Sequence, residues 1–529
     1  MKPLNKLRIA LVLVLNITIA IVYYLDNLNA NYSELSSDIQ NIIPVAQKFD
    51  NPNLFQDDLY VNNLNNVKYY TPFYVQTLRC IAKFTDYNYV QAINVLGLIC
   101  HLLFGILWFF LLYKFVNNYW VAFLISIILR GVIWLPGLEI WGISDLWTIM
   151  PRTVYISLMP IPFLLISQQF IKLLFGGVLI GLIFNFHPIT GLGGILMFVT
   201  LVVLLLYYYP KLRERFSVPK LLCLILAIGL GISPFIITYF GKTSVAVTYD
   251  LNAFNEAFNA RIPEYFKNPW LFLKQWFGFK TLFFIIPLLL YVLIAFKERG
   301  IGKNAKLLLV LTLILIAIPS LAIPLERLVN GVFNTNLRMS FQLIRMQKVA
   351  IIPCVFALAF VLDYVFSKIK TPHILPAVVF VYVCILVFSK SEMLNNVPFF
   401  GDDISKSILP RSLSAFAPED RKPLAIDKMA KYIKAHTKTT DVICGSHVLR
   451  GATKRSIIFD GKGASMLIEG NPKRFTQWQK RQKTINNFTT IDEVISYLRY
   501  FNADYFVTTS TIPQCELVHS EGKLKLYKL

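Results

Sequence analysis

The chain has 529 residues, of which 56% are hydrophobic and only 16% are charged, and its mean hydropathy is +0.56. Soluble domains carry about 25% charged residues, so a soluble globular protein is excluded for most of this sequence. In a soluble protein the net charge of +22 would suggest that the protein binds nucleic acid. Here anionic lipid headgroups and basic cytoplasmic loops account for that charge. We therefore expect a membrane protein that contacts lipids and no nucleic acid.

Apolar runs long enough to cross a bilayer as helices recur along the chain. The first run, 9–25, follows Lys2, Lys6 and Arg8 and has no convincing cleavage site after it. It therefore predicts an uncleaved helix whose N-terminus is cytoplasmic. The fold class expected is membrane all-α, with about eleven transmembrane helices. The other ten predicted spans are 89–113, 119–136, 153–170, 173–187, 190–208, 219–240, 278–296, 306–324, 349–367 and 373–389.

The charge of the loops predicts the orientation. The turns that leave even-numbered spans read "YPKLRERF", "FKERGIGKNAK" and "SKIKTPH", and short basic loops are typical of the cytoplasmic side. The opposite side then receives the first loop, 26–88, and everything after residue 389. We predict a polytopic domain at 1–389 and an extracytoplasmic domain at 390–529, in a multi-pass protein of the cytoplasmic (inner) membrane.

The tail alternates helix and strand patterns, which suits a small α/β domain. "KPLAIDKMAKYIKAHTKTTDVICGS" predicts an amphipathic helix, a turn and a buried strand, and "RSIIFDGKG" and "ADYFVTTS" predict two more strands. "TIDEVISYLRYFN" predicts a capped helix, and "CELVHSEGKLKLYKL" a hairpin around Glu521 and Gly522. Cys444 and Cys515 both fall in this domain, where a disulfide and two free thiols are equally expected.

Carboxylates and cations gather in the segments that face the predicted external side. At helix ends in a membrane such groups are expensive unless a water-filled cavity uses them. The cations before the span at 349–367 are spaced to share one helical face. The candidate residues from the first loop are Asp38, Asp57, Asp58 and Tyr70 in "YYTPFY", and those from later segments are Asp145, Arg152, His187, Arg338, Arg345 and Lys348.

One reaction suits this set well. In the transfer of a sugar from a polyprenyl-phosphate-linked donor, cations hold the phosphate leaving group. A carboxylate takes the proton of the acceptor hydroxyl, which belongs to a glycan, lipid or protein. A lipid-linked donor needs no nucleotide site, and the sequence has no Gly-rich phosphate loop. No metal-ligand spacing is seen among the cysteines, and a divalent cation is left open.

Four stretches resemble a group of uncharacterised bacterial membrane proteins related to GT-C glycosyltransferases. They are "NPNLFQDDLYV…YYTPFY", "MPRTVYISL", "FNFHPITGLGGI" and "KRSIIFDGKGAS…FTQWQKR". The resemblance covers about 50–200 and 450–485. It implies a GT-C-like bundle with a catalytic first external loop, but no known substrate. The enzyme we expect is an inverting hexosyl- or pentosyltransferase. The family positions fall on Asp58, on Pro151 and Arg152, on His187 and Pro188, and on Asp460 and Lys462.

The sequence departs from the family at Asp57, where a small residue is more usual, and Asp38 stays a second candidate base near the first span. Each residue also has a structural interpretation. Asp38 can cap a helix, Arg152 can reach the interface as an anchor, and Asp57 with Asp58 can form a solvated turn. The alternative function is a non-catalytic or transport-related membrane protein with a GT-C-like bundle, although internally related halves, typical of transporters, are not visible.

Overall fold

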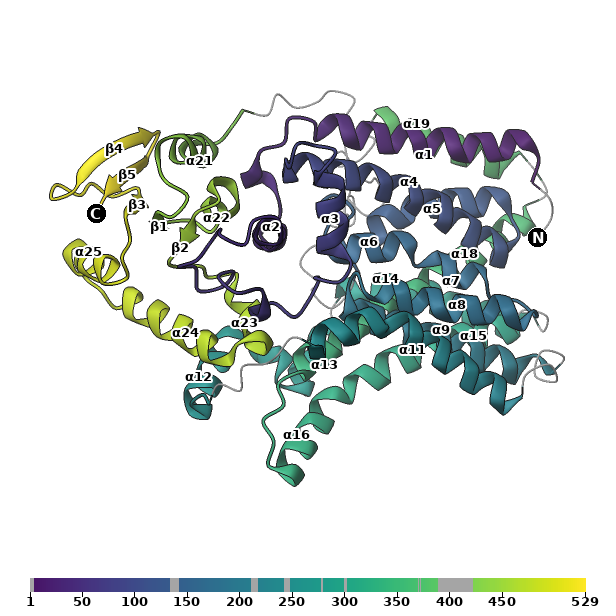
Figure 1. Ribbon diagram of the computed structural model, residues 1–529. Coiled ribbons are helices and arrows are strands. Elements are labelled where there is room, and N and C mark those ends of the chain that lie inside the picture. Colours follow the sequence, from purple (N-terminus) through teal and green to yellow (C-terminus); the bar gives the residue numbers. More distant parts are fainter. Residues whose placement is uncertain are drawn as a thin grey trace. The chain divides into compact units, whose positions relative to one another are not determined.

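The computed structural model describes residues 4–133, 142–210, 217–241, 248–276, 279–298, 302–369, 371, 373–388 and 422–529. It separates into two compact units, and each is assembled from three stretches of the sequence (Figure 1). Unit 1 comprises Met1–Asp26, Leu96–Phe235 and Pro263–Pro418, and unit 2 comprises Asn27–Val95, Ile236–Ile262 and Glu419–Leu529. Most of the first predicted external loop is thus grouped with the tail. The domain boundary predicted at residue 389 lies outside the described residues.

Helices form the bundle of unit 1 (Figure 1). The predicted membrane all-α class is confirmed at this level, and the count of eleven spans stays a prediction. Among the described residues, six stretches are long and apolar enough to cross a membrane: α1 (Lys6–Asp26), α4 (Tyr89–Val116), α9 (Pro188–Tyr208), α11 (Val218–Gly241), α15 with α16 (Gly302–Ser320, Ala322–Phe333), and α17, η4 and α18 (Ser340–Leu343, Ile344–Ala350, Ile351–Lys368). Shorter helices with apolar runs are α5 (Tyr119–Val132), α8 (Phe170–Phe184), α14 (Phe279–Lys297) and α19 (Ile374–Phe388).

The predicted span at 153–170 is not one helix. It consists of α6 (Pro151–Leu158) and α7 (Pro160–Leu164), with Met159 between them. Proline has no N–H for a helical hydrogen bond but fits the first turn of a helix. Pro160 therefore ends one helix and begins the next. At eight and five residues, neither helix has the length of a membrane span.

The two ends of the bundle are defined by contacts of α1. At the end of α1 the ring of Tyr23 lies 5.4 Å from that of Trp147, in the segment that leads into α6. At its beginning the hydroxyl of Tyr119, the first residue of α5, donates to the carbonyl of Arg8 over 3.1 Å. These two ends are called the Asp26 end and the Arg8 end below.

A buried cation lies between α1, α4 and α5. The Arg130 guanidinium donates to Oδ1 of Asn16 over 2.7 Å and to the carbonyl of His101 over 2.9 Å. All three residues are at most 5% exposed. A cation in such a place is costly unless polar groups surround it. This network therefore ties three neighbouring helices together by their polar groups.

Unit 2 contains a five-stranded sheet in the order β2-β1-β3-β5-β4. β1 pairs in parallel with β2 and β3, whereas β5 pairs antiparallel with β3 and β4. The strands and the hairpin predicted for the tail are confirmed. Their bounds are β1 (Val442–Cys444), β2 (Ser456–Ile457), β3 (Tyr505–Thr508), β4 (Glu516–Glu521) and β5 (Leu524–Lys528).

Helices of the tail pack against this sheet, and the first loop contributes further helices to unit 2. α21 (Ala425–His436) places Met429 and Ile433 against Ile443 and Leu526 of the sheet. The predicted capped helix is α25 (Ile491–Tyr500), which begins with a capping box at Thr490. Cys444 is buried and Cys515 partly exposed, and both are free thiols. The remaining helices of unit 2 include α2 (Ser37–Asp50), α3 (Tyr74–Ala82), α12 (Leu251–Arg261), α22 (Val448–Thr453), α23 (Ala464–Gly470) and α24 (Pro472–Asn486).

Candidate functional site

His187 begins α9 and occupies its N-cap position. Its Nδ1 accepts a hydrogen bond from the backbone N–H of Thr190 over 3.1 Å, and Pro188 takes the first helical position. The "HPIT" stretch is therefore a local helix-start signal. Because Nδ1 is the acceptor, the neutral imidazole carries its proton on Nε2.

Two glycines of "GLGG" bring other helices against the beginning of α9. A Cβ at Gly193 would lie 2.5 Å from the carbonyl oxygen of Met346 in η4, and one at Gly194 would overlap the hydroxyl of Tyr155 in α6. A side chain at either position would force these elements apart. The glycines thus allow α6, α9 and η4 to meet at one place.

Three predicted cations gather around His187 as a result. Arg152 comes from the first turn of α6, and Arg345 and Lys348 come from η4. Burial is the largest of the causes that lower the pKa of His187 to about 3, and the positive charges of Arg152, Lys348 and Arg345 are the other causes. His187 is therefore neutral at physiological pH while three cations surround it. We call these four residues the His187 cluster.

The geometry of η4 explains why two of the cations act together. It is a 3₁₀ helix of seven residues, and in such a helix side chains at positions i and i+3 eclipse one another. Arg345 and Lys348 have this spacing. Arg345 also lies over the ring of Phe266, 4.6 Å from its centroid, and Lys348 is 6% exposed.

Arg338 does not share that helical face, which corrects the sequence prediction. Oε2 of Glu326 accepts from the backbone N–H of Met339 over 2.6 Å and of Ser340 over 2.7 Å. This carboxylate starts α17 at Ser340, so Arg338 precedes the helix in an irregular segment.

Asp145 lies in the segment that leads into α6. Its carboxylate accepts from the N–H of Trp147 over 2.8 Å, and its carbonyl accepts from the hydroxyl of Thr153 over 3.0 Å. Ser144 contacts the same hydroxyl at 2.7 Å. These contacts fix the turn that presents Arg152, so Asp145 belongs to the same end of the bundle as the His187 cluster.

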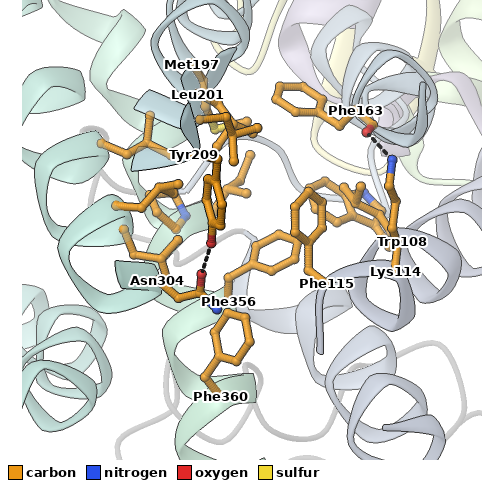
Figure 2. A pocket seen from close by; sticks show the side chains of 17 residues that line it. Trp108, Lys114, Phe115, Phe163, Met197, Leu201, Tyr209, Asn304, Phe356 and Phe360 are labelled. Atoms are coloured by element: carbon orange, nitrogen blue, oxygen red, sulfur yellow. Dashed lines mark hydrogen bonds between the residues drawn. The ribbon is translucent and has the colours of Figure 1, made fainter. Parts of the chain in front are cut away.

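An apolar cavity of about 280 Å³ lies in the bundle and extends toward the Arg8 end. α9 lines it from Met197 to Leu205, followed by Tyr209 just after the helix, and α18 lines it from Ile352 to Phe360. Figure 2 shows the polar groups at its margin, where Tyr209 donates to Asn304 over 3.0 Å and Lys114 to the carbonyl of Phe163 over 3.4 Å. The helices that carry the His187 cluster at their beginnings thus line this cavity further along.

Asp58, the favoured catalytic candidate, is fully buried in unit 2. Its Oδ1 accepts from the N–H of Tyr60 over 2.8 Å and of Val61 over 3.1 Å. Its Oδ2 accepts from Nε of Arg450 over 2.7 Å and from the N–H of Ile457 over 3.0 Å. Four donors therefore surround this carboxylate, an arrangement typical of a structural ion pair rather than of a base.

Arg450 joins two of the stretches that carry the family resemblance. Its Nη1 donates to Oδ2 of Asp460 over 2.5 Å and to Oδ1 of Asn41 over 3.1 Å, while its Nε binds Asp58. All of these side chains are buried. Burial raises the pKa of Asp460, but Arg450 and the N–H groups of Gly463 and Lys462 together bring it below its ordinary value.

The other candidates of unit 2 lie nearer the surface. Nζ of Lys462 pairs with Oδ1 of Asp38 at 3.1 Å, and both side chains are 41–50% exposed. Asp57 is exposed. Tyr70 is partly buried and has a positive φ of 64°. Two of the contacts between the loop and the tail thus involve predicted residues: Arg450 joins Asp58 to Asp460, and Asp38 pairs with Lys462.

Two functional candidates escaped the sequence analysis, Arg450 and Glu469. Arg450 lies in "HVLRGAT", where no spacing marks it as the partner of a residue 392 positions away. Glu469 precedes Gly470, and the tight contact of this glycine with Asn66 helps to place the carboxylate beside the first loop. An acidic residue next to a glycine is too common a signal to single out.

No group of three or more His, Cys, Asp or Glu side chains among the described residues is placed to hold a metal ion. A search with protein-family models finds no match to this chain, and a search of the curated proteins finds none either.

Proposed function

We propose that this chain is a glycosyltransferase of GT-C type. It moves a sugar from a polyprenyl-phosphate-linked donor to an extracytoplasmic glycan, lipid or protein, in the cytoplasmic (inner) membrane and with its C-terminal domain outside. The observation that carries the proposal is the His187 cluster, in which Arg152, Arg345 and Lys348 surround a neutral imidazole at one end of an apolar bundle.

The His187 cluster suits a phosphate group for three reasons. Arg152 lies in the first turn of α6 and His187 caps α9, where the helix dipole already favours anions. Charge-assisted hydrogen bonds from arginine to phosphate are among the strongest in proteins. Nε2 of the neutral His187 adds a donor without another charge.

In the proposed transfer the bond between C1 of the sugar and the phosphate oxygen breaks. A bond forms between C1 and the acceptor oxygen, the acceptor proton passes to a base, and the polyprenyl phosphate leaves as an anion. Attack from the face opposite the leaving group inverts C1. Arg152, Arg345 and Lys348 stabilise the negative charge that grows on the phosphate as it leaves.

The apolar cavity supports a lipid-linked donor. Its volume of about 280 Å³ is near the lower limit of ligand pockets. It suits a few isoprene units rather than a whole chain. Since α9 and α18 line it, a polyprenyl chain whose phosphate lies at the His187 cluster would extend along the same helices.

The test is binding of undecaprenyl phosphate to the purified full-length protein, followed by native mass spectrometry. Arg152→Ala and Arg345→Ala should each weaken binding about 10–150-fold, the equivalent of a charge-assisted bond of roughly 1.5–3 kcal/mol. Lys306→Ala removes an exposed cation of α15 and should change nothing. Undecaprenol, which lacks the phosphate, should bind weakly to all four proteins. Equal binding of both lipids to every variant would refute the phosphate site.

The alternative is a non-catalytic or transport-related protein with the same lipid site. The observation that favours it is the full set of donors around the fully buried Asp58, because an acceptor hydroxyl cannot reach a carboxylate enclosed in this way. Mass spectrometry of surface glycans and lipid-linked sugars, with and without the gene, separates the two. Loss of a glycan together with accumulation of a lipid-linked sugar supports the transferase, and an unchanged glycan profile supports the alternative.

A further inference from the structure

Two tyrosines and a glutamate form a polar cluster within unit 2. Tyr69 comes from the first loop, Tyr239 from the last turn of α11, and Glu469 from α23. Both phenol groups donate to Oε2 of Glu469, Tyr239 over 2.9 Å and Tyr69 at close range. Among the described residues, Oε1 has no hydrogen-bond partner. Glu469 is only partly buried, so this oxygen is able to accept hydrogen bonds from a ligand.

Aromatic rings surround the carboxylate. The ring centroid of Tyr69 lies 6.1 Å from that of Tyr70 and 6.1 Å from that of Tyr239. Nζ of Lys68 lies 4.7 Å from the centroid of Tyr239. The cluster therefore offers apolar ring faces, one carboxylate oxygen and one ammonium group within a few ångströms.

Close packing holds the cluster in place. A Cβ at Gly470 would overlap the carbonyl oxygen of Asn66, so only glycine lets α23 approach the first loop. Asn471 then donates to Oδ1 of Asn66 over 2.9 Å. Tyr70 has a φ of 64°, a conformation that side chains other than glycine adopt rarely and that persists where surrounding contacts enforce it, often near ligand sites.

The electrostatic surroundings make Glu469 unusual. Burial raises its pKa, while hydrogen bonds from Tyr69 and Tyr239 and the charge of Lys68 offset that effect only in part. Burial is the main cause that keeps the pKa of Tyr69 well above its ordinary value, and the negative charge of Glu469 is the second. Tyr69 therefore stays protonated and remains a donor to the carboxylate.

We propose that Tyr69, Tyr70, Tyr239, Glu469 and Lys68 form a binding site for a neutral carbohydrate. Glu469 Oε1 would accept a hydrogen bond from a sugar hydroxyl, and the tyrosine rings would pack against the apolar face of the sugar. A few fixed polar groups among aromatic side chains are typical of small-molecule sites. The role of this site in binding the acceptor of a transferase rests on the proposed function. Its ability to bind a sugar rests on the geometry of unit 2 alone.

The experiment uses the full-length protein in nanodiscs and an array of neutral oligosaccharides of glucose, galactose, mannose and N-acetylglucosamine. The wild-type protein should bind at least one of them. Glu469→Gln keeps the shape of the side chain but loses the charged acceptor, and it should weaken binding at least 10-fold. The matched control is Glu256→Gln, which changes an exposed glutamate of unit 2 that pairs with Lys483 on the surface and should leave binding unchanged.

Thermal unfolding checks that Glu469→Gln is folded. A second variant, Glu469→Asp, keeps a carboxylate and should retain part of the affinity for the sugar. Equal binding by the wild-type protein and Glu469→Gln overturns the inference. So does the failure of the wild-type protein to bind any oligosaccharide of the array. Undecaprenyl phosphate binding is measured on the same samples, because it depends on unit 1. If the wild-type protein binds a sugar but does not bind undecaprenyl phosphate, the proposed function is refuted and the sugar site stands.

Discussion

Nε of Arg450 donates to Oδ2 of Asp58 over 2.7 Å, and neither side chain is more than 1% exposed. A buried ion pair contributes little net stability compared with apolar residues. Removing one partner is costly, however, because it leaves the other charge without compensation. The aspartate that the family resemblance marks as the loop position thus fastens the first loop to the tail within unit 2.

We predict that Asp58→Asn destabilises unit 2. The neutral amide cannot balance Arg450, and it must place an NH₂ group where a backbone N–H or the guanidinium now donates. The expected cost is about 3–5 kcal/mol, visible as a lower melting temperature and lower protein yield. Thermal unfolding of the purified protein measures it.

Asp57→Asn is the matched control for this change. Asp57 is the preceding residue and its side chain is exposed, so the same substitution should alter stability by no more than about 0.5 kcal/mol. If Asp58→Asn is as stable as Asp57→Asn but loses glycan transfer, Asp58 is a base after all and the ion pair is secondary.

The role of Asp58 shows where sequence reasoning ends. The carboxylate, the loop and the late Asp-x-Lys stretch were all recognisable, but the guanidinium that joins Asp58 to Asp460 lies 392 residues from Asp58. No local pattern encodes such a pairing. In contrast, the strand at 442–444 and the capped helix at 491–500 depend on local periodicity and a capping box, and both were predicted correctly.

The His187 cluster was predictable in part. The sequence placed all four residues on one side of the membrane, because charge is expensive in apolar segments and its position is therefore informative. It did not reveal that Arg338 is excluded from the helical face. Arg338 is excluded because the carboxylate of Glu326 in α16 accepts from the N–H of Ser340 and so fixes the start of α17 after Arg338.

The pH dependence of stability tests the lowered pKa of Asp460. A carboxyl group whose folded pKa lies below its unfolded value stabilises the fold above the unfolded pKa, and this contribution is lost as pH falls through the folded pKa. The melting temperature of the wild-type protein should therefore exceed that of Asp460→Asn by a constant amount from pH 7 to about 5. The difference should shrink only below about pH 4, the ordinary range of aspartate. A difference that already shrinks at pH 6 would contradict the pairing with Arg450.

Gly193→Ala tests how the His187 cluster is assembled. The new Cβ would lie 2.5 Å from the carbonyl oxygen of Met346, so η4 must shift and carry Arg345 and Lys348 with it. We expect a loss of undecaprenyl phosphate binding of at least 10-fold, with a lower melting temperature. Gly229→Ala in α11 is the control, since nothing lies within 4 Å of its added Cβ and alanine favours helices. Equal binding by both variants would mean that α9 and η4 need not be in close contact.

Cysteine labelling tests the predicted orientation. In a background with Ser at the exposed Cys80 and Cys223, a membrane-impermeant maleimide applied to intact spheroplasts should label Asp57→Cys and Ala260→Cys. It should not label Lys303→Cys, because the basic loop before α15 is predicted to be cytoplasmic. All three positions are exposed, so access to the reagent decides the result. Labelling of Lys303→Cys alone would reverse the orientation and place the first loop in the cytoplasm.

The pH dependence of sugar binding tests the carbohydrate site and follows from the raised pKa of Glu469. The ionised carboxylate accepts hydrogen bonds from sugar hydroxyls, and protonation replaces one acceptor by a donor. Binding should therefore weaken as pH falls through the pKa of Glu469. The midpoint should lie above about 4.3, the value of an ordinary glutamate.

The groups that face Glu469 set the direction of two further shifts. Tyr69 and Tyr239 donate to it, and Lys68 is the nearby charge, and all three favour the ionised form. Tyr239→Phe removes one donor, and Lys68→Met removes the cation. Either change should move the midpoint of sugar binding to higher pH, while Glu256→Gln should leave it in place. Isothermal titration between pH 4 and 8, with the best oligosaccharide from the array, gives each midpoint. A shift to lower pH in Tyr239→Phe would mean that the phenol does not hold the carboxylate that binds the sugar.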